Sequence, residues 1–313
     1  MAAARRVVCF GECMIELQGP AFGTLRQTHG GDTYNTAVYL ARCAPALRTA
    51  YASAVGDDAL SAQLLERWQA DGVQTDLVRQ LAGRLPGLYQ ISVDERGERR
   101  FSYWRNESAA RAYFEAPSTP LEDAADQIDA LYFSGISLAI LPLAGRERLF
   151  ALAERLAARG ATVAFDNNYR PRLWADAATA RAAFDRACAL ATVALLTLDD
   201  EVALRGDAAL THAFALRCRD VVVKRGPEPT LVRDADGAVH EVATEPVPRV
   251  VDTTAAGDSF AGAWLAARLT GADARAAAAA GNRLAARVVQ HPGAVIPADA
   301  MADLAASAPG AGA

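Results

Sequence analysis

Short apolar runs alternate along the chain with stretches of helical periodicity. The runs lie at Val7–Gly11, Thr49–Val55, Leu131–Ser134, Thr162–Phe165, Val193–Thr197 and Val221–Val223. Apolar strands that alternate with helices are typical of a parallel sheet with crossover helices. One such helix should begin at Asp57 as its N-cap, bury Leu64 and Trp68 on one face, and end at Gly72. The pattern therefore predicts an α/β fold.

The segment from Gly87 to Arg105 breaks this alternation. It reads GLYQISVDERGERRFSYWR, with two strand-like halves around a polar turn at Asp94–Glu98, and so predicts an antiparallel hairpin. The earlier segment Cys13–Gln27 is also strand-like. We expect these two distant segments to form a small β-lid over the larger sheet. A further hairpin is predicted around Asp236-Gly237.

Composition and charge restrict the function. The chain has 313 residues, of which 52% are hydrophobic and 22% charged, as expected for one large domain or two smaller ones. A net charge of -5 without a dense basic run argues against nucleic acid or an acidic membrane as partner, and favours a small molecule. Without a signal peptide or a bilayer-spanning segment, the protein is expected in the cytosol. Its five scattered cysteines and four histidines indicate neither a disulfide framework nor a zinc site.

A candidate phosphate site lies in the stretch DTTAAGDSF. The common glycine-rich phosphate motifs are absent, but the small residues of Ala255–Asp258 precede a long apolar helix, whose first N–H groups can bind an anion. An aspartate there would repel a static phosphate, yet it could accept a proton from a hydroxyl that attacks one. Alternatively, Asp258 only caps the helix or complements its dipole, and this alternative is favoured on the tetrapeptide alone.

Two arginines and two tyrosines are candidates for ligand contact. Tyr103 and Arg105 alternate onto one strand face, and Tyr89 can lie on the partner strand. Arg170 follows the strand that ends at Phe165, and ligands bind at the carboxyl ends of parallel strands. Two arginines at one site would suit a carboxylate or phosphate. Both could instead be solvated surface residues.

Three further positions leave two interpretations open. Gly30-Gly31 precedes a helix with Asp32 as its expected N-cap and Asn35 in its first turn, and the glycines bring backbone close to a ligand or form a plain turn. Lys224, the only lysine in the chain, lies at the end of a strand. It either contacts a nucleotide or is a lysine that drift in codon usage left by chance. The acidic run Asp199–Glu201 either holds Mg²⁺ through water or is solvated.

Taken together, DTTAAGDSF, GGDTYN, GLYQISV, FSYWRNESAA and DNNYRPRLW resemble the ribokinase-like (PfkB) sugar kinases, and within them the kinases of 2-keto-3-deoxygluconate. The resemblance extends from Gly11 to Gly293. The signature D-T-x-x-A-G-D is specific for the superfamily, and the lid residues with NNYRPRLW narrow the substrate. The resemblance implies one ribokinase-like domain over residues 1–305, with a three-layer α/β/α core, a mainly parallel sheet and a discontinuous β-lid at about 12–29 and 86–106. Residues 306–313 are expected to be a flexible tail.

The resemblance also implies an activity, the ATP-dependent phosphorylation of 2-dehydro-3-deoxy-D-gluconate at its terminal hydroxyl to give the 6-phosphate. It makes Asp258 the catalytic base and the amides from Ala255, Ala256 and Gly257 onward the anion hole. The implied sugar contacts are Gly30, Gly31, Asp32, Thr33, Tyr34, Asn35, Tyr89, Tyr103, Trp104, Arg105, Arg170 and Asp258. The implied nucleotide contacts are Asn168, Tyr169, Arg170, Lys224, Arg225, Gly226, Pro229, Ala255, Ala256, Gly257 and Asn282. Mg²⁺, a monovalent cation such as K⁺ and a homo-oligomeric state are further implications.

Two departures from the family pattern matter. Ala255 stands where the signature has glycine, so we expect a backbone conformation compatible with alanine. The N-x-x-E motif keeps Glu201, which is expected to hold the metal through water, but has Leu198 in the asparagine position. Two other functions stay open: a kinase of a neutral sugar such as fructose or ribose, and a sugar-acid sensor without turnover. The paired arginines argue against the first, and the intact Gly257-Asp258 argues against the second.

Overall fold

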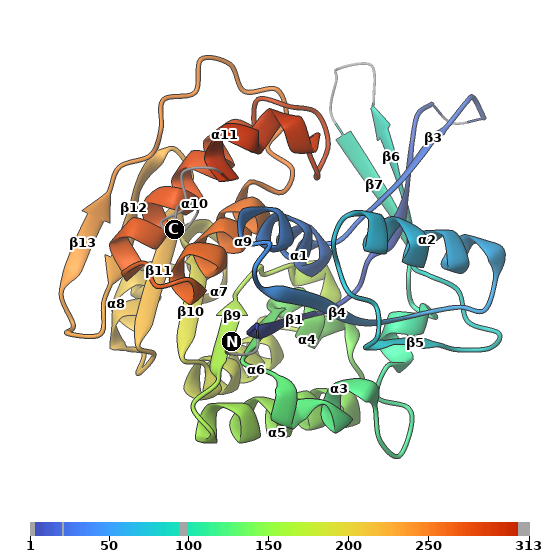
Figure 1. Cartoon of the computed structure of the whole chain (residues 1–313), viewed down its shortest axis with the longest axis horizontal. Coiled ribbons are helices and arrows are strands. Elements are labelled where there is room, and N and C mark those ends of the chain that lie inside the picture. Colours follow the sequence, from blue (N-terminus) through green and yellow to red (C-terminus); the bar gives the residue numbers. More distant parts are fainter. Residues whose placement is uncertain (1–3, 21, 94–98, 306–313) are drawn as a thin grey trace.

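The structure, a computed structural model, describes residues 4–20, 22–93 and 99–305. Within these ranges a nine-stranded sheet runs in the order β13-β12-β11-β10-β9-β8-β1-β4-β5 (Figure 1). Its strands are β1 (Arg6–Phe10), β4 (Arg48–Val55), β5 (Val78–Gln80), β8 (Ala130–Ser134), β9 (Thr162–Asp166), β10 (Val193–Thr197), β11 (Asp220–Arg225), β12 (Glu228–Arg233) and β13 (Val239–Val242). In this sheet, neighbouring strands are parallel from β5 at one edge through β4, β1, β8, β9 and β10 to β11. At the other edge β12 and β13 are antiparallel. The six predicted strands and the second hairpin are confirmed.

Helices cover both faces of this sheet and make it the middle of three layers. One face is covered by α1 (Asp32–Cys43), α2 (Ala59–Ala70), α9 (Ala256–Leu269) and α10 (Ala274–Val288). The other is covered by α3 (Pro120–Asp123), α4 (Gly135–Ile140), α5 (Leu143–Ala158), α6 (Ala177–Leu190), α7 (Leu198–Arg205) and α8 (Ala209–Ala215). Val8 and Phe10 of β1 face this second layer, whereas Val7 and Cys9 face the first, because side chains alternate along a strand. The predicted α/β/α architecture is confirmed.

The starts of two helices differ from the prediction by one residue. Asp58, not Asp57, caps α2, since its carboxylate accepts from the N–H groups of Leu60 and Ser61. Gly31, not Asp32, is the N-cap of α1, which leaves the Asp32 side chain available for other contacts. A side chain cannot replace the hydrogen of Gly31, because its Cβ would lie 2.0 Å from the main-chain oxygen of Glu12.

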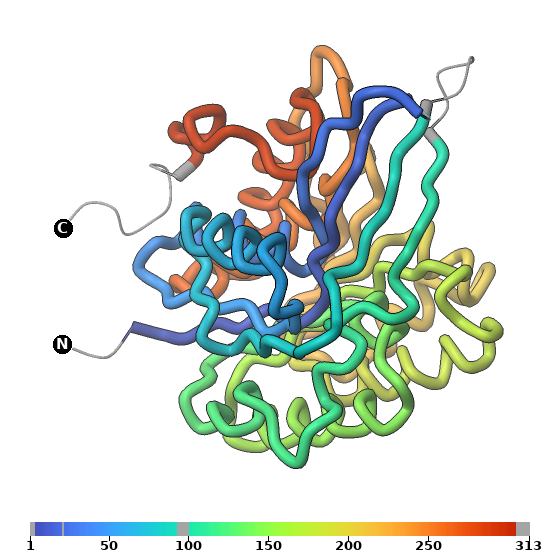
Figure 2. The backbone as a smooth tube through the Cα atoms, turned by 90° about the vertical axis from the view of Figure 1, so that its right-hand side faces the viewer, coloured from blue at the N-terminus to red at the C-terminus, as the bar shows by residue number. Residues whose placement is uncertain are grey.

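The lid is a separate four-stranded sheet of order β3-β2-β6-β7. Its strands are β2 (Met14–Gln18), β3 (Arg26–Gly30), β6 (Leu88–Val93) and β7 (Arg99–Trp104). Figure 2 shows the two early strands and the two later strands rising together beyond the larger sheet. The lid is therefore built from two distant segments, as predicted. The predicted turn at Asp94–Glu98 and the tail at 306–313 lie outside the described residues.

A buried ion pair lies at the base of the lid. Arg105, directly after β7, donates to Glu12, two residues after the end of β1, and neither side chain is more than one-tenth exposed. The pair therefore joins the lid to the segment that follows β1 of the larger sheet. Among the described helices, none combines the length and the apolar character needed to cross a bilayer.

Candidate active site

A cleft of about 550 Å³ lies between the lid and the carboxyl ends of the parallel strands. Its walls come from the lid, the start of α1, the ends of β9 to β11 and the segment that leads into α9. Ligand sites of open parallel sheets form at this edge, where the order of strands reverses, and here the reversal is between β1 and β8. The volume is in the usual range for a small-molecule site.

The start of α9 forms an anion-binding wall of the cleft. Within the described residues, the main-chain N–H groups of Gly257 and Asp258 have no hydrogen-bond acceptor in the protein, as is usual in a first helical turn. A Cβ added at Gly257 would lie 3.7 Å from Lys224 Nζ, so the glycine leaves open space beside an ammonium group. Free amides, the helix dipole and this positive charge together suit a phosphate.

Asp258 lies in the first turn of α9 but does not cap it. The N-cap is Ala255, and the Asp258 carboxylate accepts from Asn35 Nδ2 at 2.8 Å. Burial and the negative charge of Asp32 raise the pKa of Asp258 to about 7, although the hydrogen bond from Asn35 and the charge of Lys224 act in the opposite direction. A carboxylate that titrates near neutral pH suits a general base. The capping alternative is not what the structure shows.

A second carboxylate, Asp32, faces the cleft from the start of α1. It accepts hydrogen bonds from Ser134 Oγ at the end of β8 and from Asn168 Nδ2, the latter at 2.8 Å. Burial raises the pKa of Asp32, and these two hydrogen bonds oppose the rise. Asn168 itself has a positive φ of 24°, a strained conformation that turns its amide toward Asp32.

A third carboxylate, Asp166 at the end of β9, binds Lys224 Nζ at 2.7 Å, and both side chains are buried. Thr197, paired with Lys224 in the sheet, also lines the cleft. Ser134, Asp166 and Thr197 were not among the site residues predicted from the sequence. Each of them ends an apolar strand, so the carboxyl-end rule applied to Arg170 would have found them as well.

The lid contributes an aromatic surface. Tyr89 and Tyr103 are cross-strand partners with ring centroids 5.8 Å apart, and both line the cleft together with Phe101. Trp104 points to the opposite face of the lid, as strand alternation requires. Arg105 does not line the cleft either, because its guanidinium binds Glu12. Tyr89, Tyr103 and Arg105 were expected to face the same cleft, and this prediction is wrong for Arg105.

Arg170 does line the cleft, and 53% of its side chain is exposed. Its Nη1 lies 3.4 Å from Asp200 Oδ1. Tyr169, its neighbour, packs its ring edge-on against Phe184 in the core, so only its main chain is near the site. Of the two arginines expected to bind a carboxylate, Arg170 alone lines the cleft within the described residues.

Two residues of the GGDTYN segment point away from the cleft. Thr33 Oγ1 lies 3.1 Å from the hydroxyl of Tyr51, and Tyr34 donates to Asp71 at 2.8 Å. Both side chains are fully buried. Helical periodicity explains this, since positions 32 and 35 face one side of α1 and positions 33 and 34 the other. Gly30, Gly31, Asp32 and Asn35 line the cleft as expected.

Of the residues expected to contact the nucleotide, Arg225, Gly226 and Asn282 line one part of the cleft. The amide of Asn282 is fully engaged: it accepts from Thr230 and donates to two main-chain carbonyls at the end of β13. It can therefore shape this part of the cleft but has no free N–H group to donate to a base. Pro229 does not line the cleft, and its carbonyl accepts from Arg225.

Glu201 is not placed to hold a metal in the cleft. Its buried carboxylate pairs with Arg205 at 2.9 Å and accepts from Asn167 at 3.2 Å. Burial raises its pKa, but contacts with His212 and Arg205 outweigh this effect and lower it. Over the ranges that the structure describes, no group of three acidic, histidine or cysteine side chains has the geometry of a metal site. The expectation for Glu201 is corrected by these contacts.

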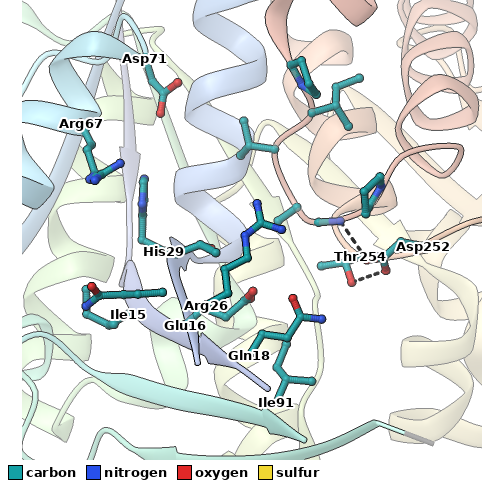
Figure 3. A pocket seen from close by; sticks show the side chains of 18 of the residues that line it. Ile15, Glu16, Gln18, Arg26, His29, Arg67, Asp71, Ile91, Asp252 and Thr254 are labelled. Carbon is teal, nitrogen blue, oxygen red and sulfur yellow. Dashed lines mark hydrogen bonds between the residues drawn. The ribbon is translucent and has the colours of Figure 1, made fainter. Parts of the chain in front are cut away.

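A second cavity of about 650 Å³ adjoins the cleft, with Thr254 and Ala294 in both linings. Figure 3 shows Arg26 and His29 of β3 at this cavity, with Arg67 of α2 beside His29 and the segment of Asp252 and Thr254 on the other side. Asp252, the first residue of DTTAAGDSF, accepts hydrogen bonds from Thr254 and from the Gly293 N–H. These bonds fix the path of the segment into α9.

Ala255 adopts the left-handed conformation, with φ 60° and ψ 16°, so the expected alanine-compatible backbone is not found. This conformation costs a residue with a Cβ about 1–2 kcal/mol. We expect Ala255→Gly to raise the free energy of unfolding by about 0.5–1 kcal/mol, after the greater unfolded-state entropy of glycine is subtracted. Urea denaturation would measure it. Ala256→Gly, at the first residue of the helix, is the control and should lower the free energy of unfolding. An equal change in this free energy for both variants would contradict backbone strain at Ala255.

Comparison with known proteins agrees with this geometry. The chain is 44% identical over 306 residues to a 2-dehydro-3-deoxygluconokinase of Dickeya dadantii, with 95% of this chain and 98% of the relative covered. It is 43% identical over 307 residues to the 2-dehydro-3-deoxygluconokinase of Escherichia coli K12, with 95% and 99% covered. The crystal structure of a fructokinase with bound ATP from Xylella fastidiosa superposes with a TM-score of 0.81 at 25% identity, over 96% of this chain and 97% of that one.

The family assignment rests on both the sequence and the cleft. The profile of the pfkB family of carbohydrate kinases matches residues 4–301, which is nearly all of the described sequence. The residues at the start of α9, the strand-end polar groups and the lid all lie within this range. The chain belongs to the pfkB family of carbohydrate kinases.

Proposed function

We propose that the protein transfers the γ-phosphoryl group of ATP to the terminal hydroxyl of 2-dehydro-3-deoxy-D-gluconate, forming the 6-phosphate. The observation that carries the chemistry is the Asp258 carboxylate, with a pKa of about 7, at the anion-binding start of α9. The choice of substrate rests on the activity named for relatives that share 44% and 43% of their residues with this chain.

The cleft supplies each part of a phosphoryl transfer. Asp258 takes the proton of the sugar hydroxyl as that oxygen attacks phosphorus. The amides of Gly257 and Asp258, with Lys224 beside them, face the negative charge on the transferring group. PfkB kinases use ATP with Mg²⁺. The ion would be bound together with ATP and would neutralise part of the charge of its phosphates. The lid covers the sugar side and limits hydrolysis of ATP by water.

Arg170 is the group that would bind the substrate carboxylate. It lies at the cleft wall, and its contact with Asp200 is long enough to exchange for a ligand. We expect Arg170→Ala to raise the KM for the sugar acid by about tenfold, with a smaller effect on kcat, because an exposed charge-assisted contact is lost. Initial rates at varied substrate concentration would measure it.

Arg172→Ala is the matched control for this variant. Arg172 is exposed two residues further on and does not line the cleft. Its replacement should leave KM unchanged. Equal KM values for Arg170→Ala and the wild type would contradict the carboxylate contact.

The first experiment is ADP formation by the purified protein with Mg-ATP and 2-keto-3-deoxygluconate, with fructose, ribose and gluconate in parallel. The proposed function predicts a clear preference for the keto-deoxy acid. Turnover of a neutral sugar alone would keep the role of Asp258 and overturn the substrate. Binding of the acid without turnover would favour a sensor.

A further inference from the structure

Asn35 contacts the proposed base directly from another element of the fold. It lies in the first turn of α1, is 4% exposed and lines the cleft. Its Nδ2 donates to Asp258 Oδ2 at 2.8 Å, which links the side chains of α1 and α9 directly. This contact needs an explanation beyond substrate binding, because it engages the carboxylate rather than the ligand space.

The orientation of the Asn35 amide follows from this contact. A carboxylate only accepts hydrogen bonds, so the atom that faces Asp258 must be the NH₂ group. The other amide atom, Oδ1, is buried and has no hydrogen-bond partner among the described residues. A Cβ added at Gly30 would lie 3.7 Å from this oxygen and 3.6 Å from the Tyr89 hydroxyl, so Oδ1 faces the sugar side of the cleft under the lid.

We propose that Asn35 is a positioning residue for Asp258. It binds Asp258 Oδ2, so that Asp258 Oδ1 is presented to the attacking hydroxyl, and it keeps the carboxylate ionised in the neutral range. This inference rests on the proposed function of Asp258 as a base. A hydrogen bond to the ionised form stabilises that form over the protonated one. The unpartnered Asn35 oxygen would accept from a substrate hydroxyl, which couples the position of the sugar to that of the base.

The charges around Asp258 explain why such a donor is needed. Burial raises the pKa of Asp258 most, and the negative charges of Asp32 from α1 and Asp166 from β9 raise it further. Lys224 from β11 lowers it, but the same ammonium group is shared with Asp166. The charge of Asp258 also acts on the phenols of Tyr39 and Tyr132, but burial raises the pKa of both, so they stay neutral. Asn35 is thus the neutral donor that offsets two nearby negative charges.

The test compares Asn35→Leu and Asn35→Asp with the wild type in the pH dependence of kcat/KM, measured from about pH 5 to about pH 9. The acid limb is the part of the profile where kcat/KM falls as the pH is lowered. In the wild type its midpoint should lie near the Asp258 pKa of about 7. Loss of the donor in Asn35→Leu should move the limb upward by about one unit. Asn35→Asp puts a like charge in the same place and should move it further. An acid limb at the same pH in all three proteins would overturn the inference.

Thr36→Val is the matched control. Thr36 is the next residue in the same helical turn. Its Oγ1 lies 3.0 Å from the main-chain oxygen of Asp32 and 3.2 Å from that of Asp258, and it does not bind the Asp258 carboxylate. Its replacement is expected to lower the melting temperature and to leave the acid limb in place. A limb that moves as far in Thr36→Val would show that any disturbance of α1 suffices, and would also overturn the inference.

A measurement without turnover separates this inference from the proposed function. The ¹³C carboxyl signals of labelled aspartate can be titrated by NMR, with Asp258→Asn identifying the signal of Asp258. An upward shift of its titration in Asn35→Leu supports the contact even if no sugar is phosphorylated. An unchanged titration in an active enzyme rejects the role of Asn35 and leaves the kinase assignment intact.

Discussion

Replacing Asp258 with asparagine is expected to lower kcat by roughly 10² or more, the scale of a lost general base. Asparagine has nearly the same shape and cannot accept the proton of the attacking hydroxyl. The Kd of ATP and of the sugar acid should change by only a few-fold, because the amides of α9 and the remaining walls of the cleft are intact. Steady-state kinetics and calorimetric titration would measure the two effects.

Stability gives an independent control for this variant. The folded state raises the pKa of Asp258 from about 4 to about 7, so the folded protein binds the additional proton in this interval. The contribution of this group to stability is therefore present at low pH and is lost as pH rises toward 7. Asp258→Asn should melt higher than the wild type at pH 8. Near-normal turnover by a folded variant would reject Asp258 as the base.

Replacing Lys224 with methionine is expected to lower kcat by roughly 10²–10³, the effect of removing one preorganised charge from a transferring group. Its ammonium group lies beside Gly257 and binds Asp166 at 2.7 Å. Methionine retains the length of the side chain and removes the charge. The loss also leaves Asp166 without its cation, which raises the pKa of nearby Asp258. The acid limb of the rate profile should therefore move upward as well.

Lys224→Arg is the matched variant, since it keeps the charge and should retain more activity than Lys224→Met. The sequence offers a second readout, because Lys224 is the only lysine. An amine-specific reagent should modify the terminal amino group fast and the largely buried Lys224 slowly, and Mg-ATP should slow the reaction of Lys224 alone. Peptide mass spectrometry would show it. Equal labelling with and without Mg-ATP would reject the contact with phosphate.

The architecture could be predicted from the sequence because it depends on periodicity. Apolar runs such as Val193–Thr197 are strands, and the hairpin in the lid interrupts the alternation as expected. Helix starts were less certain, since Asp57 and Asp58 are both good caps and only the path of the chain decides between them. The homo-oligomeric state and the cytosolic location stay sequence-based predictions.

The site was predicted only in part, because side-chain direction depends on contacts between distant segments. Arg105 belongs to the motif that narrows the substrate, yet in the fold it pairs with Glu12, which is 93 positions away. Glu201 likewise pairs with Arg205 on its own helix. Neither of these two ion pairs was predicted from the sequence. Residues on short, directly constrained segments, such as Gly257 and Asp258, were placed correctly in the cleft.

The lid strand β3 ends at Gly30 and α1 begins at Asp32, so one residue, Gly31, joins the cover of the site to the helix that carries Asn35. Gly31 has no room to swing independently, because it is packed against the main chain of Glu12. For protein engineering, strand and helix form one indivisible module. A lid exchanged between two such kinases without its helix would bring new sugar contacts to a base aligned for another substrate, whereas exchange through Asn35 would transfer specificity and alignment together.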